Sequence, residues 1–335
     1  MRPKCRRASR EMTMKAARYT AFGPPEVVSV VDVDVPVPSA DQVLVRNHAA
    51  TVTAADRAMR AGSPRLARLV AGLRRPKNPV LGTEFAGEVV AVGAATTRFA
   101  VGDRVFGATD LGFGAHAQYV CVKEAGALAT MPENLSYTEA VTLVDGTGLV
   151  FLRDHAKVRS RQSILINGAS GSVGVGAVQI ARHFGADITA VCSGAGAELV
   201  TRLGARRVID YTTTDFTVEG RTYDVIFDVA GVSSFRRCRV LLNKGGSYLT
   251  PVPSLAILLQ ALWTARIGDR RAVVAFTGLR PVAKKVMDLA LVRQLAEAGS
   301  LVPVVDHIFP LERIADAYRH IDRQGKQGTT VVSLS

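Results

Sequence analysis

Three glycines spaced three residues apart, Gly168, Gly171 and Gly174, lie where the apolar run SILIN gives way to the segment SVGVGAVQIARHFG. Glycine has no side chain, so a turn built from it lets the backbone approach a ligand closely. The first N–H groups of a helix lack helical partners and carry partial positive charge. A strand, this turn and a helix therefore predict a pyrophosphate site. The alternative is that the glycines only permit tight packing of the helix on the strand.

The end of the next strand, DITAVCS, indicates which dinucleotide would fit. NAD sites usually place Asp or Glu there to bind the ribose 2′-hydroxyl. Ser193 occupies that position, and Asp187 comes before the strand begins. A carboxylate would repel a 2′-phosphate, whereas a hydroxyl can donate a hydrogen bond to it. The sequence therefore predicts NADPH as the cofactor. Arg202, Arg206 and Arg207 follow and could add positive charge, although each alone is typical of a solvent-facing residue.

The elements that must position these residues form a βαβ series after about Ser136. Ser136 and Glu139 have the spacing of a capping box, and the segment SYTEAVTLVDGTGLVFLRDHA has helical spacing. Short apolar runs then alternate with helical segments, which is typical of a buried parallel sheet. The runs are SILING, DITAVCS, RRVIDY, DVIFDVAG, GGSYLTP and AVVAF.

The residues from Met14 to about Thr138 show a different pattern, with many short strands and regular turns that predict a compact, barrel-like domain. After Pro281 the segment VAKKVMDLALVRQLAEAG predicts an amphipathic helix. The β-like segments LVPVVDHIFPL and TTVVSL follow it. We therefore expect the end of the chain to return to the first domain.

The composition of the chain limits the classes of function. With 335 residues, 48% of them hydrophobic and 21% charged, most of the chain should be globular. No apolar stretch reaches the roughly 18 residues that a membrane helix needs. The four cysteines are scattered without a C-x-x-C pair, which indicates neither a disulfide framework nor a zinc knuckle. We expect a cytoplasmic protein that does not bind a membrane.

The net charge of +13 has two concentrated sources. Residues 1–13 are basic and lack the apolar core of a secretory signal, so we expect a disordered extension. The stretch from Arg57 to Lys77 holds seven basic residues. A solvated basic face explains that stretch more simply than contact with nucleic acid, because no aromatic residues interleave with the charges.

The sequence motifs along the chain resemble those of a known family. From Met14 to Ser335 the chain is similar to the medium-chain dehydrogenase/reductase superfamily, in particular its zinc-independent quinone oxidoreductase and enone reductase branch. The resemblance implies an α/β fold with a GroES-like, β-rich substrate domain over residues 14–137 and 281–335. It also implies a Rossmann domain, a doubly wound parallel sheet, over residues 138–280, with the active site in the cleft. The matching stretches are KAARYTAFGPPEVV, VTAADRAMRAG, LGTEFAGEVVAVG, GDRVFG, GASGSVG, LGARRVIDY, YDVIFDVAG and GKQGTTVV.

The resemblance also indicates whether the protein has the ligands of a zinc site. Zinc-dependent relatives carry a Cys three residues before an Asp, where this chain has Thr53 before Asp56. They carry Gly-His-Glu where this chain has Gly82, Thr83 and Glu84. Threonines do not make the Cys/His site that zinc prefers, so no metal is expected. Hydride addition to a conjugated C=C–C=O system then fits best, because hydrogen-bond donors can stabilise the resulting enolate.

The resemblance assigns roles to individual residues. Thr53 and Asp56 would be catalytic residues of the cleft, although Asp56 could equally cap the helix DRAMRAG. The residues implied to bind the cofactor are Thr147 beside the carboxamide, Gly171, Ser172, Val173 and Gly174 at the pyrophosphate, Ser193 and Tyr211 at the 2′-phosphate, Val229, Ala230, Thr250 and Val252 along the nicotinamide, and Lys326 near the cleft.

Four positions depart from the family pattern. Quinone reductases often carry Asn at the position of Thr53 and tyrosines at Arg57 and Pro64, and a lysine that grips the 2′-phosphate falls on Gly196. No residue stands out as a proton donor.

We expect an NADPH-dependent reductase of quinones or α,β-unsaturated carbonyls that forms a homodimer through the strand AVVAF. The alternatives are an NAD(P)-dependent alcohol dehydrogenase and an NADPH-sensing protein that binds RNA or another acidic partner.

Overall fold

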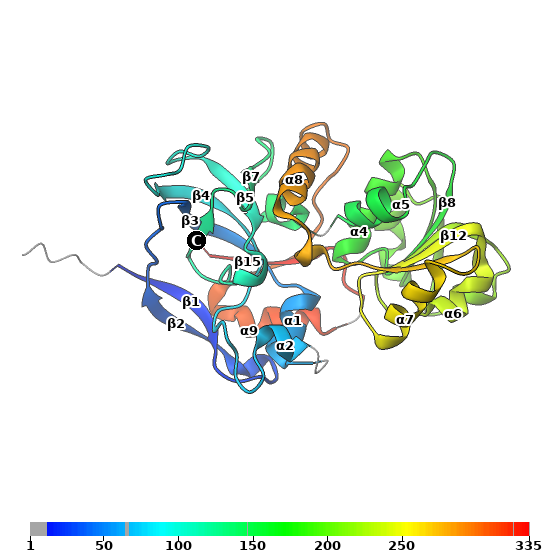
Figure 1. Cartoon of the computed structure of the whole chain (residues 1–335), viewed down its shortest axis with the longest axis horizontal. Helices are drawn as coiled ribbons and strands as arrows, with labels where there is room; N and C mark the ends of the chain where they lie inside the picture. Colours follow the sequence, from blue (N-terminus) through cyan, green and yellow to red (C-terminus); the bar gives the residue numbers. More distant parts are fainter. Residues whose placement is uncertain (1–11, 64–66, 146, 324, 335) are drawn as a thin grey trace, which may run out of the picture.

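Two sheets, joined by loops and helices, organise the molecule (Figure 1). The computed structural model describes residues 12–63, 67–145, 147–323 and 325–334. The basic segment 1–11 therefore lies outside the described residues, together with part of the basic stretch after Arg57. Among the residues that the structure describes, no helix combines the length and apolarity that crossing a bilayer demands.

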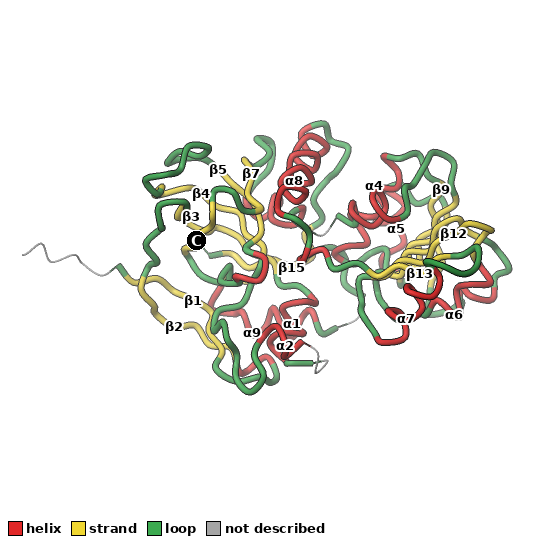
Figure 2. The backbone as a smooth tube through the Cα atoms, viewed as in Figure 1, coloured by secondary structure: helices red, strands yellow, loops and turns green. Residues whose placement is uncertain are grey.

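The first sheet has seven strands and is mainly antiparallel (Figure 2). Its order is β14-β15-β3-β4-β5-β7, and β6 pairs with β3. The two strands from the end of the chain thus join a sheet built from its beginning. The strands are β3 (Gln42–Thr51), β4 (Glu84–Val92), β5 (Arg104–Ala108), β6 (Tyr119–Lys123), β7 (Ala127–Thr130), β14 (Val305–Pro310) and β15 (Thr329–Ser333). Beside it, β1 (Thr13–Tyr19) and β2 (Val28–Asp34) form a two-stranded antiparallel sheet.

The second sheet has six parallel strands in the order β10-β9-β8-β11-β12-β13. The chain order runs outward from β8 in both directions, so the sheet has a switch point beside β8, where open parallel sheets bind ligands. The strands are β8 (Ser163–Asn167), β9 (Asp187–Cys192), β10 (Arg207–Asp210), β11 (Tyr223–Asp228), β12 (Leu242–Thr250) and β13 (Arg271–Val274).

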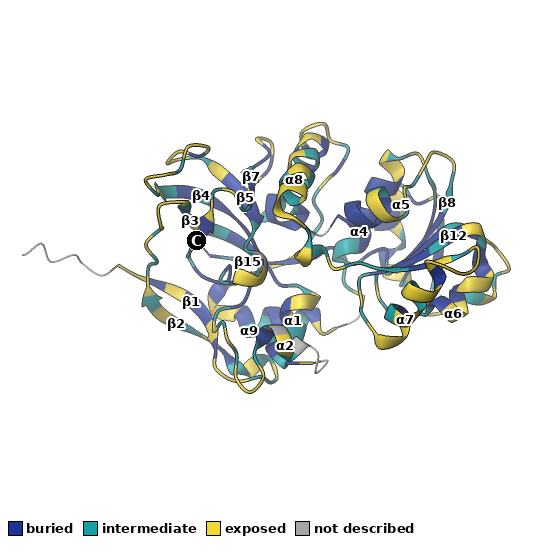
Figure 3. Cartoon of the chain, in the orientation of Figure 1, coloured by how far each residue is buried: buried dark blue, intermediate teal, exposed yellow. Residues whose placement is uncertain are grey.

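Helices cover both faces of this parallel sheet, which explains why its central strands β8, β9 and β11 are mostly buried (Figure 3). Side chains alternate along a strand, so Ile164 and Ile166 pack with α4 (Ser172–His183) and α5 (Ala197–Leu203). Leu165 points the other way and packs with residues of α6 (Phe235–Cys238) and α7 (Leu255–Thr264).

The segment between the two sheets is helical but interrupted, unlike the single helix that its spacing predicts. Ser136 and Glu139 form the expected capping box at the start of α3 (Tyr137–Ala140). A short 3₁₀ turn (Val141–Leu143) and a π-helix (Val150–His155) follow. Gly148 separates them with a φ of +65°, and a Cβ there would lie 2.9 Å from the Ala177 Cβ. The helix breaks here because the backbone must pass this close to α4.

Four further helices complete the described fold. α1 (Ala54–Ala61), α2 (Ala67–Ala71) and α9 (Ile314–Ile321) lie together in Figure 1, and α8 (Val282–Glu297) packs against β7.

A buried carboxylate braces the carboxyl ends of β8, β11 and β12. Asp228 is fully buried and accepts hydrogen bonds from Asn167 Nδ2 at 2.8 Å and the Tyr248 hydroxyl at 2.8 Å. The backbone N–H groups of Gly231 and Ser233 donate to the same carboxylate at 3.0 and 2.8 Å. Burial, followed by the nearby charge of Asp228, raises the pKa of Tyr248. Four donors thus compensate the loss of water around Asp228 and fix the loop after β11.

We predict that Tyr248→Phe lowers the free energy of unfolding by roughly 1.5–3 kcal/mol, the usual contribution of a hydrogen bond to a charged group. Urea unfolding followed by circular dichroism measures the change. Tyr211→Phe, at a side chain that is 46% exposed, is the matched control and should shift stability by less than about 0.5 kcal/mol. Equal stability of Tyr248→Phe and the unmodified protein would show that the Tyr248 hydroxyl does not support Asp228.

Candidate functional site

The turn between β8 and α4 is formed by glycines with distinct roles. Gly168 has a φ of +85°, which favours glycine. A Cβ on Gly174 would lie 2.1 Å from the Gly168 carbonyl oxygen, so the first turn of α4 can pack here only without a side chain. A Cβ on Gly171 would meet nothing nearer than the same oxygen at 3.5 Å. The protein therefore leaves room beside Gly171, at the N-terminus of α4, where a diphosphate would bind.

The end of the chain crosses this turn and completes it. The Gly328 N–H donates to the Ser170 carbonyl at 2.8 Å, and the hydroxyls of Ser172 and Thr329 lie 2.7 Å apart. Sequence reasoning did not identify Gly328 or Thr329, because their contacts depend on how the C-terminal strand returns. Ser172, Val173 and Gly174 lie in the first turn of α4, as expected for a pyrophosphate site.

Lys326 lies beside this turn, but its ammonium points to a helix end. Lys326 Nζ donates to the carbonyls of Ile321 and Arg323 at 2.7 Å each, at the C-terminus of α9. Burial, followed by the charge of Arg57, lowers the pKa of Lys326. Its carbonyl accepts from the Ser170 hydroxyl at 3.3 Å. The structure thus brings the Lys326 backbone, rather than its charge, to the glycine turn.

Ser193 and Tyr211 meet at the ends of β9 and β10. Cys192, the last residue of β9, pairs with Asp210, the last residue of β10. Ser193 and Tyr211 are therefore the residues that directly follow two neighbouring strands. Tyr211 is exposed, and Ser193 Oγ lies 3.9 Å from the Cβ position of Gly325. Sequence reasoning overlooked the neighbouring Asp210, whose pKa is lowered by hydrogen bonds from Thr212 and which contacts Gly194.

The residues expected along the nicotinamide lie at the other end of the turn. The N–H groups of Val229 and Ala230 donate to the Asn167 carbonyl at 3.0 and 3.2 Å. Thr250 is buried, and its hydroxyl accepts from the Val252 N–H at 3.2 Å. The loops after β8, β11 and β12 are therefore held together at one edge of the parallel sheet.

A cavity of about 110 Å³ opens beside these loops and between the two sheets. Thr147 and Val173, both expected at the cofactor, line it together with Pro251, the residue between Thr250 and Val252. Most of its remaining wall is apolar, from Ala108 and Ala127 on one side to Leu289 and Val292 on the other. The polar side chains in the wall are Asp145, Thr277, Arg280, Lys285 and Asp288.

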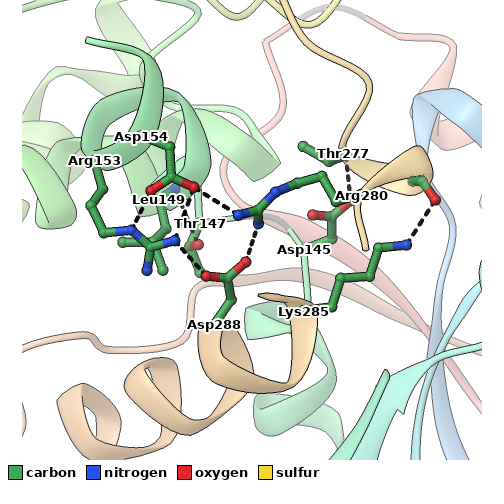
Figure 4. Close-up of polar contacts among 10 residues, drawn as sticks. Asp145, Thr147, Leu149, Arg153, Asp154, Thr277, Arg280, Lys285 and Asp288 are labelled. Carbon is green, nitrogen blue, oxygen red and sulfur yellow. Dashed lines mark hydrogen bonds and ion pairs between the residues drawn. The ribbon is translucent and has the colours of Figure 1, made fainter. Parts of the chain in front are cut away.

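A ring of four charged side chains, Arg153, Asp154, Arg280 and Asp288, lies beside this cavity, and the last two line it (Figure 4). Arg153 contacts Asp154 and Asp288 at 2.6 Å each, and Arg280 contacts Asp154 at 2.7 Å and also Asp288. The hydrogen bond from Arg153 is the main cause that lowers the pKa of Asp154. The ring ties the π-helix to α8 and to the loop before it, so it fixes one wall of the cavity.

Thr53 and Asp56, the expected catalytic pair, form the capping box of α1. The Thr53 hydroxyl donates to Asp56 Oδ2 at 2.7 Å, and the Gly82 N–H donates to Asp56 Oδ1 at 3.2 Å. Asp56 is buried, and neither side chain lines the cavity. Within the described ranges, no group of three or more His, Cys, Asp or Glu side chains is placed to hold a metal ion.

Comparisons with known proteins agree with this architecture. The family model of the alcohol dehydrogenase GroES-like domain matches residues 39–133, and that of the zinc-binding dehydrogenases matches residues 203–332. The quinone oxidoreductase from Coxiella burnetii has the same fold, with a TM-score of 0.86 and 24% identity over 97% of this chain and 100% of that one. The CurF ER cyclopropanase of the curacin A pathway superposes with a TM-score of 0.84 and 27% identity over 96% and 99%.

Two curated relatives extend along nearly the whole chain. The quinone oxidoreductase of Sus scrofa is 29% identical over 98% of this chain and 100% of its own. The trans-enoyl reductase pgmF of Aspergillus terreus is 30% identical over 96% of both chains. The glycine turn, the two sheets and these similarities together show that the chain belongs to the medium-chain dehydrogenase/reductase superfamily, in its quinone oxidoreductase branch.

Proposed function

We propose that the protein is an NADPH-dependent oxidoreductase that reduces quinones, or the C=C bond of α,β-unsaturated carbonyl compounds, without a metal. The observation that carries the proposal is a glycine turn suited to a dinucleotide beside a largely apolar cavity lined by Thr147 and Val173. The names of the relatives, quinone oxidoreductase and trans-enoyl reductase, support this substrate class.

The residues at two zinc-ligand positions of metal-dependent relatives support the metal-free reaction. Thr53 stands at one of them and is engaged with Asp56 in the capping box of α1. Thr83 stands at the other, and its carbonyl accepts from the Thr109 N–H at 2.7 Å. A threonine hydroxyl is a poor zinc ligand compared with Cys or His.

When bound, the nicotinamide supplies the hydride on which the reaction depends. The chain contributes binding through the N–H groups of the glycine turn and orientation through Thr147 and the loops after β11 and β12. The apolar cavity wall excludes water and strengthens the polar interactions that remain.

The surroundings of Glu84 favour the protonated form of its carboxyl group. Glu84 begins β4, is buried, and is hydrogen-bonded to the Thr51 hydroxyl. Burial, together with the nearby charges of Asp145 and Asp56, raises the pKa of Glu84 to about 8. Glu84 is therefore mostly protonated at neutral pH.

We also propose a cytoplasmic homodimer. The described cysteines Cys121, Cys192 and Cys238 are free thiols, as a reducing compartment favours. β13 is the edge strand of the parallel sheet, and an edge strand can pair with its copy. Leu259 and Leu262 are exposed on the adjacent helix α7.

A substrate panel tests the proposed function. NADPH and NADH would be supplied with quinones, enals, enones and simple alcohols, and consumption of the reduced cofactor would be followed by its absorbance. The proposal expects NADPH oxidation with quinones or enones. Activity on alcohols that is lost on chelation would favour an alcohol dehydrogenase. Salt-dependent RNA binding without turnover would favour the binding-protein alternative.

For the cofactor, we predict that Ser193→Asp weakens NADPH binding by about tenfold or more and leaves NADH binding within about threefold. A carboxylate would face the 2′-phosphate, and tenfold corresponds to about 1.4 kcal/mol. Fluorescence titration with both cofactors measures the ratio of NADPH affinity to NADH affinity. Asp210→Asn is the matched comparison, and removal of its charge should raise this ratio. An unchanged ratio in Ser193→Asp would place the 2′-phosphate elsewhere.

For Glu84, we predict that stability falls as pH rises from about 4.5 to about 8, since the folded carboxyl keeps a proton that the unfolded chain has lost. Glu84→Gln should flatten this part of the profile and be more stable than the unmodified protein at pH 8 by roughly 1–4 kcal/mol. Urea midpoints across this pH range measure both. Parallel profiles of the two proteins would mean that Glu84 ionises normally in the fold.

A further inference from the structure

Two cationic side chains of the described residues line the cavity, Arg280 and Lys285 (Figure 4). The Arg280 guanidinium is bound to Asp154 and Asp288 within the ring of four charges, and its side chain is 14% exposed. Arginine does not release a proton in proteins, and here its geometry is fixed by two carboxylates. Arg280 is therefore a structural part of the wall.

Lys285 belongs to the same wall, and a hydrogen bond ties its ammonium to the loop before α8. Its Nζ donates to the Gly278 carbonyl at 2.7 Å, and both residues line the cavity with Thr147 and Val173. An ammonium carries three protons and can donate to more than one acceptor. Thr277 Oγ1 donates to Asp145 at 2.9 Å on the neighbouring part of the wall.

The ring of four charges sets the position of Lys285. Asp288 follows Lys285 by three residues on α8, so the two lie on one side of the helix. Because Asp288 is bound to Arg153 of the π-helix and to Arg280, the first turns of α8 cannot rotate without breaking ion pairs. The π-helix Val150–His155 belongs to a class of helical turns that is frequent at functional sites.

We propose that Lys285 is the proton donor of the reaction. The inference rests on the proposed function and adds to it the residue that sequence reasoning could not name. The substrate's β carbon gains a C–H bond with the two electrons of the nicotinamide hydride, and the C=C π electrons move to form an enolate. The enolate electron pair then forms the Cα–H bond with a proton from Lys285 Nζ. The N–H bond breaks, leaving a neutral amine that water reprotonates.

Quinones provide an internal comparison. Hydride addition to a quinone gives a stabilised aromatic oxyanion, which takes a proton from water without help. An enolate must be protonated at carbon, and proton transfer to carbon is slower than transfer to oxygen. A positioned acid typically accelerates such a transfer by about 100-fold or more. Loss of the donor should therefore affect enone reduction far more than quinone reduction.

The test compares Lys285→Met and Lys285→Arg with Lys284→Met, a matched control at the exposed neighbouring residue. Lys285→Met should lower kcat for an enone by roughly 100-fold and kcat for a quinone by less than about threefold. Lys284→Met should change neither. Lys285→Arg should restore little of the enone rate, because a guanidinium holds its protons. Equal melting temperatures and NADPH affinities would exclude misfolding.

Two further readouts do not depend on rate. In D₂O the unmodified protein should deliver deuterium to one face of the α carbon, and Lys285→Met should give a mixture of both. In the unmodified protein without substrate, NADP⁺ should protect Lys285 but not Lys284 from reductive methylation, as measured by peptide mass spectrometry.

Enone and quinone rates that fall together in Lys285→Met, or deuterium that stays on one face, would overturn the assignment of Lys285. So would equal methylation of Lys285 with and without NADP⁺. If the unmodified protein reduced neither quinones nor enones, the proposed function itself would fail, and methylation would still report whether Lys285 faces the cofactor site.

Discussion

A single close approach, between the first turn of α4 and the Gly168 carbonyl, determines how the site is built. No side chain fits at Gly174, because its Cβ would lie 2.1 Å from that oxygen. The same packing brings the helix N-terminus and its unpaired N–H groups to the end of β8. The room at Gly171 is a consequence, since the helix begins there and the protein places no atom close to its missing Cβ. Everything proposed about the cofactor depends on this turn.

The second constraint is that residues far apart in the sequence complete the site. Thr329, the first residue of β15, contacts Ser172 of the glycine turn, and the ring of four charges joins Arg153 to Asp288 beside the cavity. The first contact joins the start of α4 to the C-terminal strand, and the second joins the π-helix before β8 to α8. A proton donor on α8 would therefore be positioned by the same contacts that hold the two sheets around the cavity.

Sequence analysis succeeded where the determining interactions are local. The glycine turn and the capping box of α3 are set by residues within a few positions of one another. The capping box of α1 also shows the limit of this reasoning. Asp56 was a candidate for catalysis and for capping, and the structure places its carboxylate at the helix start and away from the cavity. The positions of Thr329 and Lys285 and the hydrogen bonds to buried Asp228 depend on long-range packing. No local sequence pattern therefore reveals them.

The central claim is that a dinucleotide lies across the glycine turn, and Gly171→Val tests it most directly. The φ of −76° and ψ of 176° at Gly171 suit valine, and the space around it should let the variant fold. The account predicts an unchanged melting temperature without ligand and NADPH affinity reduced by at least about tenfold, or about 1.4 kcal/mol, in a calorimetric titration. Unchanged NADPH affinity in a folded Gly171→Val protein would contradict it.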